Sequence, residues 1–593
     1  MDLYVNGFFI GYSEGAHNTA EFDLTGKLKS GHNELVVVVH RWCNGTYLED
    51  QDMFRNNGIF RDVLLRTEEP TDLWDIDAKT EKKPDGYTLT LSAQTLSDID
   101  VAFTVKGHGL EQTATVTARN GTAQAVFAGL DVTEWNAEVP TLYNIYYETA
   151  TSCVKEKIGF RTVEIKQDVF LLNGRKIKLK GVNHHDTDAA NGYTMSPDDI
   201  ERDMLVCKRF NIDTVRTSHY PPDPLLLELA DELGIYIVDE NDWRRTVRSP
   251  CSSRRPTTPS ATTPSGKATI WTASCGCISG TKSAGTHRLL CGALATRRAA
   301  ITTPMPCTIT SSSTLPCRYT MRAPSTASAR LTMWAARCTP ASKWCTMSAK
   351  SAANRPGSMT AIFHVRVRPR HGRWPRQHRS YWQEIYNYDN LMGGCVWEMV
   401  DHAVLHTDGS YTYGGDHGEW EHDRNFCVDG LFYPDRSPST GAKLMRFIYR
   451  PIRVAHVSGG QFEVFNTTAF STGRYRLAFR WNDGSKTILT PQTAPLMKET
   501  VTVPLGRAVD GLLAVIVETT DTVTGKIVSE EQLVLAQEVA AAPAVKPLPG
   551  DVAVEKGRLV CRKSGVVVVA GLMRARFCTA PPPITMLTPC SIT

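Results

Sequence analysis

The sequence predicts a multidomain chain in which β-sandwiches flank an interrupted parallel β/α barrel. Its length of 593 residues exceeds the usual size of a single domain. Short stretches that alternate apolar and polar residues occupy the front of the chain and its last third, as in antiparallel sandwiches. Between them, strand-like and helix-like stretches take turns from residue 170 onward, which is typical of a parallel barrel.

The front of the chain has the pattern of two sandwiches. Residues 1–66 contain the runs LYVNGFFIGY, NELVVVVHRW and GIFRDVLLRT, each with turn residues beside it. The first run opens directly on a strand, so we expect the front of this domain to be missing. Residues 67–165 repeat the pattern over about the length of one immunoglobulin-like sandwich.

The pattern changes at Phe170. The string FLLNGRKIKLKGVN predicts a hairpin that leads into a buried strand. DDIERDMLVCKRFN predicts an amphipathic helix with Ile200, Met204, Leu205 and Phe210 on its apolar face. DTVRTSH, DPLLLELADELG and IYIVDE then predict a strand, a helix and a strand, which together are the opening of a parallel barrel.

A segment without acidic residues interrupts this barrel. Residues 244–380 contain no Asp and no Glu, yet they hold 23 of the 66 Lys and Arg and 8 of the 16 Cys. They show neither strand nor helix periodicity, so we predict that they lack regular structure and do not complete the barrel. The basic run 366–379 resembles a nucleic-acid patch and Cys275-Gly-Cys277 a metal pair, but we interpret both as accidents of this segment.

Order returns at YWQEIYNYDNLMGGCVWEMVDHAV, a predicted helix and strand, so we assign residues 166–447 to the barrel domain. Short strands over 448–540 predict a second sandwich. A Pro/Ala-rich linker follows, and within 541–593 the composition of the middle segment returns. The chain has no apolar run of about 18 residues and no signal-peptide pattern at its start. We therefore expect a cytoplasmic protein with reduced cysteines and without a membrane partner.

An ordered set of strings resembles glycoside hydrolase family two, and specifically its bacterial-type β-galactosidases. The strings are YLEDQDMFR with GIFRDV, FLLNGRKIKLKGVNHH, VRTSHYPPDP, IYIVDEND, LMGGCVWEMVDHAV, YGGDHGEW and FCVDGLFYPDR. They cover roughly residues 1–242 and 380–560. The resemblance implies a truncated jelly-roll-like sugar-binding sandwich, an immunoglobulin-like sandwich, a catalytic TIM (β/α)8 barrel, a second immunoglobulin-like sandwich and the start of a C-terminal β-domain. β-Glucuronidase and β-mannosidase are rivals within the family, and YLEDQDMFR favours β-galactosidase.

The chemistry that the resemblance implies is retaining glycoside hydrolysis, which needs two Glu side chains about 5 Å apart. The family places them in strings like WSLGNEAG and CEYAHAMG, and neither string is present. Back-translated residues 290–299, read from the third base, give Val-Trp-Ser-Leu-Gly-Asn-Glu-Ala-Gly, and the acid/base codon straddles Thr296 and Arg297. Residues 363–372, read from the second base, give Phe-Met-Cys-Glu-Tyr-Ala-His-Ala-Met-Gly, and the nucleophile codon straddles Arg366 and Val367. We infer that this segment is frame-shifted and retains no catalytic residue.

The resemblance also implies a set of substrate-binding residues: Asp52, His185, Arg216, His219, Trp397, Phe426 and Asp429. Asp52 and Phe426 would share a sodium ion, with Asp50 as the alternative to Asp52 if the register slips. We interpret Glu240, at the end of IYIVDE, as a supporting residue rather than a catalytic one.

Each of these residues also has a structural interpretation. Asp52 would then be a solvated loop acid, His185 an ordinary structural histidine, Arg216 a member of a barrel ion pair and Trp397 a buried core residue. Two positions depart from relatives: His184 stands where many have Arg, and Asp429 where some have Asn. The His184 departure is minor, whereas a carboxylate in place of an amide at 429 leaves the exact ligand role of Asp429 open.

Intact members of the family are expected to use Mg²⁺ and Na⁺, to act on β-galactoside sugars and to form homo-oligomers. The Mg²⁺ ligands would be coded in the hidden frame around Trp243 to Thr246 and at Thr296/Arg297. A hard cation needs carboxylate oxygens, so we predict no Mg²⁺ site in the chain as written. We expect no nucleic-acid partner. The alternative to an enzyme is a pseudogene-like fragment that binds carbohydrate weakly.

Overall fold

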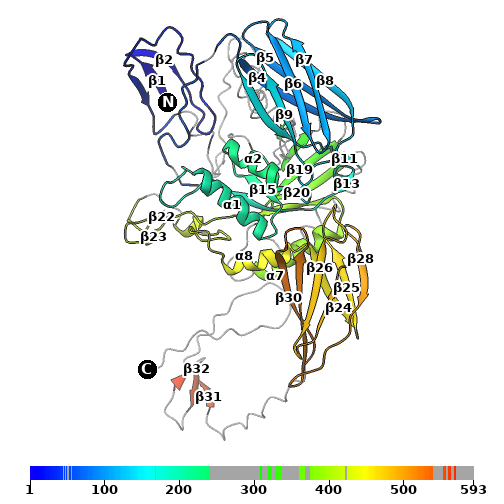
Figure 1. Ribbon diagram of the computed structural model, residues 1–593. Helices are drawn as coiled ribbons and strands as arrows, with labels where there is room; N and C mark the ends of the chain where they lie inside the picture. The colour runs from blue at the N-terminus through cyan, green and yellow to red at the C-terminus, as the bar shows by residue number, and fades with distance from the viewer. Residues whose placement is uncertain are drawn as a thin grey trace.

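A computed structural model describes most of the chain outside its middle and its end. It covers residues 1–240 except 44, 45, 47, 48, 50–52, 55, 68 and 167, and residues 374–537 except 421 and 423. Four strands between 307 and 367 and three between 552 and 568 are also described. In Figure 1 the small N-terminal sheet and the first sandwich lie above the barrel strands, and the second sandwich lies below them.

The N-terminal domain contributes a three-stranded antiparallel sheet in the order β2-β1-β3. Its strands are β1 (Asp2–Val5), β2 (Phe8–Tyr12) and β3 (Leu35–Val38). The strand expected at GIFRDVLLRT is not found, which corrects that part of the prediction. The side chains of Val63, Leu64 and Leu65 are 68%, 85% and 71% exposed. Among the described residues they have no second layer on which to pack, and a strand needs such packing to be stable.

The first sandwich has two antiparallel sheets, ordered β4-β5-β8 and β10-β9-β6-β7. Its strands are β4 (Leu73–Lys83), β5 (Gly86–Thr95), β6 (Asp100–Gly107), β7 (Leu110–Thr117), β8 (Thr122–Leu130), β9 (Tyr143–Glu148) and β10 (Cys153–Ile158). Tyr87, Leu89 and Leu91 alternate along β5 and are buried, because successive side chains of a strand point to opposite faces. The immunoglobulin-like pattern in the sequence thus corresponds to a two-layered sandwich.

A hairpin leads from this sandwich into the barrel strands. It is the sheet β11-β12-β13, with β11 (Val163–Lys166), β12 (Val169–Leu172) and β13 (Arg175–Lys176). The barrel strands form one sheet in the order β16-β15-β14-β21-β20-β19-β18-β17. Strands β14 (Leu179–His184), β15 (Thr214–Thr217), β16 (Tyr236–Val238) and β21 (Leu391–Val396) are parallel and buried along their whole length. Within the described residues, β16 and β17 are the two edges of the sheet.

The middle segment differs from its prediction. Where we expected no regular structure, the structure places β17 (Cys307–Ile309), β18 (Arg318–Arg322), β19 (Ala329–Ala336) and β20 (Met359–Val367). The runs LTMWAA and TAIFHVRV contain β-branched and aromatic residues. These residue types favour strands whether or not the segment is frame-shifted. β17 and β18 run antiparallel to their neighbours, so this half of the sheet lacks the β-α alternation of a regular barrel.

The helices α1 (Pro197–Arg209), α2 (Pro224–Leu233), α7 (Trp374–Asn387) and α8 (Thr440–Ile448) belong to the barrel region. Ile200, Met204 and Phe210 of the first helical region are buried as predicted. Leu205 is 42% exposed, which corrects its assignment to the apolar face. The helical period instead brings Val206 and Cys207 onto the buried side, beside Met204.

The N-terminus of α1 has a complete capping box, and it yields a prediction. The Ser196 hydroxyl accepts from the Asp199 amide, and the Asp199 carboxylate accepts from the Ser196 amide at 3.1 Å. We expect Ser196→Ala to destabilise this end of the helix by about 1 kcal/mol. Amide hydrogen exchange of the first turn would measure the change. Ser196→Thr is the matched control that keeps the cap, and equal exchange in both variants would contradict the prediction.

The second sandwich follows α8 directly. Its sheets are β24-β25-β28 and β27-β26-β29-β30. The strands are β24 (Ile452–Ser458), β25 (Gln461–Asn466), β26 (Tyr475–Trp481), β27 (Lys486–Leu489), β28 (Lys498–Thr502), β29 (Leu512–Asp521) and β30 (Ile527–Gln537). Small antiparallel pieces complete the described chain: β22 (Val404–Leu405), β23 (Tyr411–Thr412), β31 (Val552–Glu555), β32 (Arg558–Cys561) and β33 (Val567–Val568).

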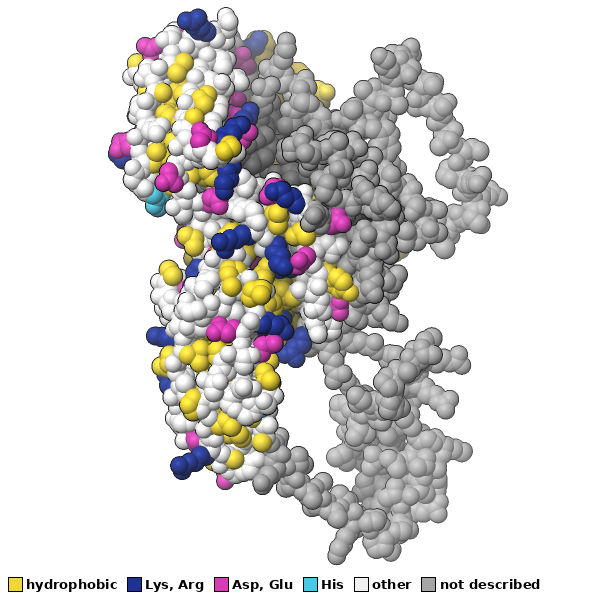
Figure 2. All heavy atoms as spheres, turned by 90° about the vertical axis from the view of Figure 1, so that its right-hand side faces the viewer, with side chains coloured by type: hydrophobic (Ala, Val, Ile, Leu, Met, Phe, Trp, Pro, Cys, Tyr) yellow, Lys and Arg dark blue, Asp and Glu magenta, His cyan; other side chains and the backbone are white. Residues whose placement is uncertain are grey.

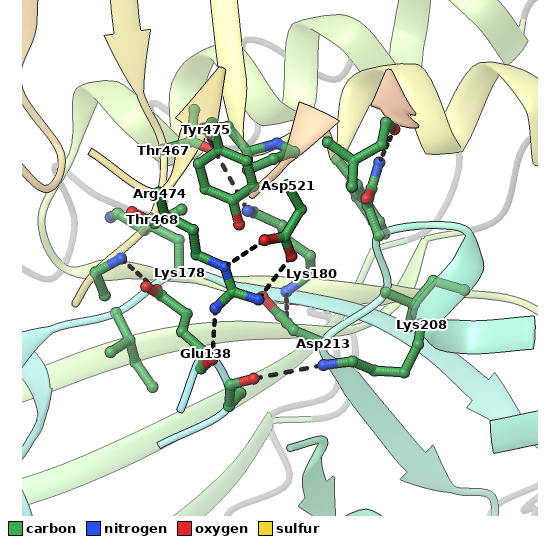
Figure 3. Close-up of a pocket in the computed structure, with 18 of the residues that line it drawn as sticks. Glu138, Lys178, Lys180, Lys208, Asp213, Thr467, Thr468, Arg474, Tyr475 and Asp521 are labelled. Atoms are coloured by element: carbon green, nitrogen blue, oxygen red, sulfur yellow. Dashed lines mark hydrogen bonds and ion pairs between the residues drawn. The ribbon is translucent and has the colours of Figure 1, made fainter. Parts of the chain in front are cut away.

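A polar cavity of about 140 Å³ lies where the two sandwiches meet the starts of the barrel strands. Figure 3 shows Arg474 directed at the Asp521 carboxylate, with nitrogen–oxygen distances of 3.1 and 2.7 Å. Lys178 donates to the carbonyl oxygens of Tyr388 and Leu391, and burial lowers the pKa of Lys178 to about 7. These cations already have partners, so we interpret the cavity as an interdomain joint.

The exposed face shown in Figure 2 carries basic and acidic side chains interspersed, with hydrophobic side chains scattered between them. This mixture is typical of a solvated surface. Within the part of the chain that the structure describes, no helix combines the length and the apolar character that a membrane span requires.

Candidate functional site

The candidate site lies at the carboxyl ends of the parallel strands. His185 follows β14, His219 follows β15, Glu240 follows β16, and Trp397 follows β21. β14 pairs with both β15 and β21, with Val182 opposite Val215 on one side and Val396 on the other. This register brings side chains more than 200 residues apart in the sequence to one edge of the sheet, where barrel enzymes hold their active sites.

An ion-paired network connects the ends of β15 and β16. Arg216 donates from Nε to Glu240 Oε1 at 2.7 Å, and His219 Nδ1 lies 3.1 Å from Glu240 Oε2. Arg216 also donates to the side-chain oxygen of Asn183 at 2.7 Å. Burial alone would raise the pKa of Glu240, but Arg216 and His219 outweigh burial and hold this pKa at about 2. Glu240 is therefore an anion that orients Arg216 and His219, which fits the supporting role predicted for it.

Aromatic rings surround His185. Trp397 is 1% exposed and stacks on His219, with 5.4 Å between the ring centroids and 11° between the planes. The His185 ring meets Trp397 edge-on at 5.4 Å, and its Nδ1 lies 3.3 Å from the Tyr220 hydroxyl. The burial of Trp397 agrees with the core interpretation that we left open. Its contacts also place it against both predicted sugar-binding histidines.

A second buried network lies between the end of β14 and helix α1. His184 Nε2 lies 3.2 Å from Asp203 Oδ2, and Arg436 donates to both oxygens of Asp203, at 2.9 and 3.2 Å. Burial would raise the pKa of Asp203, but the hydrogen bond with His184 and the charge of Arg436 lower it to about 2. The His184 side chain thus contacts Asp203 on α1 and supports the strand end that holds His185.

Three further residues, which the sequence analysis did not single out, lie after β21. Glu398 and His402 are 3% and 2% exposed, with 3.5 Å between Glu398 Oε2 and His402 Nε2. Asp401 accepts from the Gly430 amide at 2.6 Å, and burial raises the pKa of Asp401 to about 6. All three stand in the quoted string LMGGCVWEMVDHAV. Their place just after a predicted buried barrel strand, where functional side chains gather, was the available signal.

The structure leaves part of the predicted site untested. Asp50 and Asp52 lie outside the described residues, as do Trp243 to Thr246, Thr296 and Arg297. Phe426 is described only by its backbone, in the short 3-10 helix η3 (Arg424–Cys427), and Asp429 follows it, half-buried. The sodium site that the resemblance implies, and the absence of a Mg²⁺ site, therefore stay predictions.

The backbone of β20 is described up to Val367, which pairs with Val396 of β21. Positions 366 and 367, to which we assigned the nucleophile codon from the sequence, thus lie at the carboxyl end of a strand that runs parallel to β21. This is the edge of the sheet that carries His185 and Trp397. The position inferred for that codon therefore coincides with a place where a barrel presents catalytic groups.

β-Domains joined to a sheet whose strands β14, β15, β16 and β21 are parallel, with a polar site at the carboxyl ends of these strands, define the class of barrel-type enzymes. Residues 1–69 match the family model described as "Glycosyl hydrolases family 2, sugar binding domain". "Glycosyl hydrolases family 2, TIM barrel domain" matches residues 163–266 and 371–454. The chain belongs to the glycosyl hydrolases family 2.

Individual relatives agree with this assignment. The chain is 30% identical over 521 residues to the β-galactosidase of Actinobacillus pleuropneumoniae, a match that covers 79% of this chain and 49% of that protein. The chain thus spans about half the length of the curated relatives it matches.

Among solved structures, the fold is similar to a β-galacturonidase from Eisenbergiella tayi bound to galacturonate. That match has a TM-score of 0.54 and 15% identity, and it covers 76% of this chain and 85% of that one. A Bacteroides uniformis β-glucuronidase gives a TM-score of 0.51 and 16% identity, with 91% and 70% covered. These likenesses concern the fold.

Proposed function

We propose that this chain derives from a retaining β-galactosidase that hydrolyses terminal β-D-galactosyl residues, and that the chain as written does not hydrolyse glycosides. The observation that supports this most directly is the group at the carboxyl edge of the sheet: His185, His219 and Trp397, with Glu240 paired to His219. Aromatic faces and buried polar groups of this kind recognise sugar hydroxyls and ring faces. The two carboxylates of a retaining mechanism would come from the shifted frame, across Thr296/Arg297 and Arg366/Val367.

The charges at this edge favour a neutral sugar over a uronic acid. The Arg216 guanidinium already pairs with Glu240, and Arg61 and Arg436 pair with Asp186 and Asp203. Glu398, Asp401 and Asp429 add acidic groups beside them. A uronate carboxylate would meet these acids, while the guanidinium groups of Arg61, Arg216 and Arg436 already have carboxylate partners, so we prefer a galactoside to a glucuronide or galacturonide.

In the intact enzyme, one glutamate would form the glycosyl-enzyme bond, and the other would protonate the leaving oxygen and then activate water. His185, His219 and Trp397 would bind and orient the sugar between them. Asp52, Phe426 and Asp429 would add a sodium-linked contact, and Mg²⁺ would bind near the acid/base glutamate. A cytoplasmic location and homo-oligomeric assembly complete the proposal for the intact protein.

Determining the nucleotide sequence of the gene and restoring one open frame tests this proposal. We expect the restored protein to read through both hidden motifs and to hydrolyse a chromogenic β-galactoside at least about 100-fold faster than the matching β-glucuronide. A gene whose nucleotides cannot encode the two motifs in any frame would overturn the frame-shift interpretation. A preference for the glucuronide would overturn the substrate.

A non-catalytic sugar-binding fragment is the second candidate, because the residues at the strand ends are described in this chain while the catalytic carboxylates are not encoded in it. Ground-state contacts alone supply affinity without turnover. Titrating the chain with isopropyl β-thiogalactoside would detect such binding, and loss of the signal in His219→Ala would assign it to this site.

A further inference from the structure

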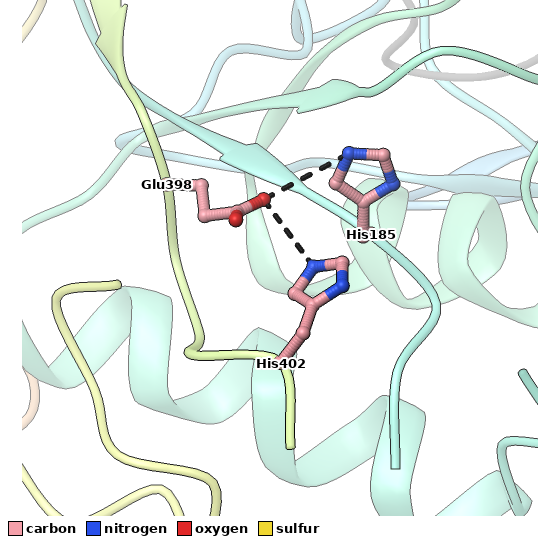
Figure 4. Close-up of side chains that lie close together, drawn as sticks. All are labelled: His185, Glu398 and His402. Carbon is pink, nitrogen blue, oxygen red and sulfur yellow. Dashed lines mark ion pairs between the residues drawn. The ribbon is translucent and has the colours of Figure 1, made fainter. Parts of the chain in front are cut away.

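Three buried side chains converge beside the strand ends (Figure 4). His185 follows β14, whereas Glu398 and His402 follow β21, and they are 4%, 3% and 2% exposed. One oxygen, Glu398 Oε2, lies 3.8 Å from His185 Nε2 and 3.5 Å from His402 Nε2. All three ligand atoms lie within 4.8 Å of one another. No role in the proposed hydrolysis accounts for this arrangement of all three groups.

We propose that His185, Glu398 and His402 bind one divalent transition-metal ion of the Zn²⁺ type. Two imidazole nitrogens and one carboxylate oxygen would supply three ligands, and the fourth position would stay open to water. The site shares no residue with the Mg²⁺ ligands expected of the family. The inference rests on described side chains and is independent of the frame-shift interpretation.

The distances can reach those of a tetrahedral ion if the side chains move. With metal–nitrogen and metal–oxygen bonds of about 2.0–2.1 Å, neighbouring ligand atoms stand about 3.3 Å apart. The contacts of Glu398 Oε2 with His402 and His185 must close by a few tenths of an ångström. The two imidazole nitrogens, which lie within 4.8 Å of each other, must approach by up to about 1.5 Å. β14 and β21 are neighbouring strands of one sheet, so the backbone already holds the ligands together.

Burial explains why an ion would be favourable here. Glu398 Oε2 and His402 Nε2 make no hydrogen bond in the described part of the chain, and a buried carboxylate needs a compensating charge. A bound dication would supply that charge.

The donor set also selects the kind of metal. Imidazole nitrogens suit Zn²⁺, Cu²⁺, Ni²⁺ and Fe²⁺, whereas Mg²⁺ and Ca²⁺ prefer oxygen ligands. The second nitrogen of His185 meets the Tyr220 hydroxyl at 3.3 Å, the kind of outer contact that orients a ligating histidine. The Phe54 and Trp397 rings lie beside the cluster, with centroids 5.7 Å from His402 and 5.4 Å from His185, respectively.

Titration of the full chain, freed of metal, with Zn²⁺ and with Co²⁺ tests the site. We expect one tight equivalent, with Co²⁺ absorption bands typical of four or five ligands and without thiolate charge-transfer bands. Glu398→Gln and His402→Gln should each weaken binding at least about 100-fold, because each removes a ligand rather than an outer partner. His417→Gln is the matched control, since His417 and His406 form an accessible histidine pair with centroids 5.0 Å apart. It should leave the tight site unchanged.

X-ray absorption of the zinc-loaded chain provides a measurement that needs no variant. Nitrogen and oxygen neighbours at about 2.0–2.1 Å, with scattering from two imidazoles and no sulfur at about 2.3 Å, would support the site. Absence of a tight equivalent in the unsubstituted chain would overturn the proposal. A tight equivalent that persists in both Glu398→Gln and His402→Gln, or that shows sulfur ligands, would overturn it as well.

Discussion

Turnover of a chromogenic β-galactoside by the chain as written is expected to equal the buffer background. The retaining mechanism needs one carboxylate as nucleophile and a second as acid and base, and each does work that the other cannot replace. In the frame-shift that we infer from the sequence, both codons are read as other residues, across Thr296/Arg297 and Arg366/Val367. The proposed sugar-binding residues His185, His219 and Trp397 would hold a ground state, and uniform binding of substrate and transition state does not accelerate chemistry.

The frame-restored protein is the matched comparison for this assay. It should exceed the uncatalysed reaction by at least about 10⁶-fold, the lower range for enzymes. Replacing the restored glutamate at either motif with glutamine should return turnover towards the level of the chain as written. If the chain as written instead reached within about a hundredfold of an intact family member, and Asp52→Ala abolished that activity, the catalytic carboxylates would lie elsewhere.

The start of the barrel could be predicted because its signals are local. A buried strand, the Ser196 cap, an apolar helix face and the left-handed Gly234 after α2 are each encoded within a few residues. The prediction that Leu205 lies on the buried face of α1 was wrong, but the helix itself was predicted correctly. Apolar spacing alone fixes a helix face to within about one position.

The middle of the sheet could not be predicted, for a different physical reason. Strand β20 pairs with β19 and β21 across longer distances, Ala329 with Met359 and Ile362 with Leu391, and its register depends on those neighbours rather than on any local period. The same holds for the site. His185 and Glu398 meet because β14 pairs with β21. His219 and Glu240 meet because β15 pairs with β16, and no spacing along the sequence encodes either contact.

The residues beneath the site show the same dependence on pairing. Asp203 was one acid on a predicted helix, and Arg436 one base in the quoted string FCVDGLFYPDR. The structure joins them to His184, a position at which the family resemblance implies Arg in many relatives. Because His184 has this buried acidic partner, we infer that a histidine here is accommodated by the network on α1 rather than by the sugar site.

Breaking this network should cost far more than breaking an exposed ion pair. Asp203 and Arg436 are 1% and 7% exposed, so Asp203→Ala leaves a buried guanidinium without its carboxylate and should destabilise the barrel region by about 3–5 kcal/mol. Hydrogen exchange of the amides of α1 and β14 would measure the loss. Arg202→Ala, which breaks the exposed pair with Asp199, is the matched control and should cost about 0.5 kcal/mol or less.

The same network predicts a pH dependence with a defined sign. The pKa of Asp203 is lowered to about 2 in the folded chain, against about 3.9 for an unfolded Asp. Its contribution is therefore fully present above about pH 4 and is lost as the pH falls towards 2, where the carboxylate binds a proton and releases Arg436 and His184. Asp203→Asn, which cannot titrate, should remove this loss of stability of α1 and β14 at acidic pH.

A double variant, Asp203→Leu with Arg436→Met, should recover much of the stability that Asp203→Ala loses, since it leaves no unpaired buried charge. If the double variant were no more stable than Asp203→Ala, the cost would come from lost packing around α1 rather than from an unpaired guanidinium.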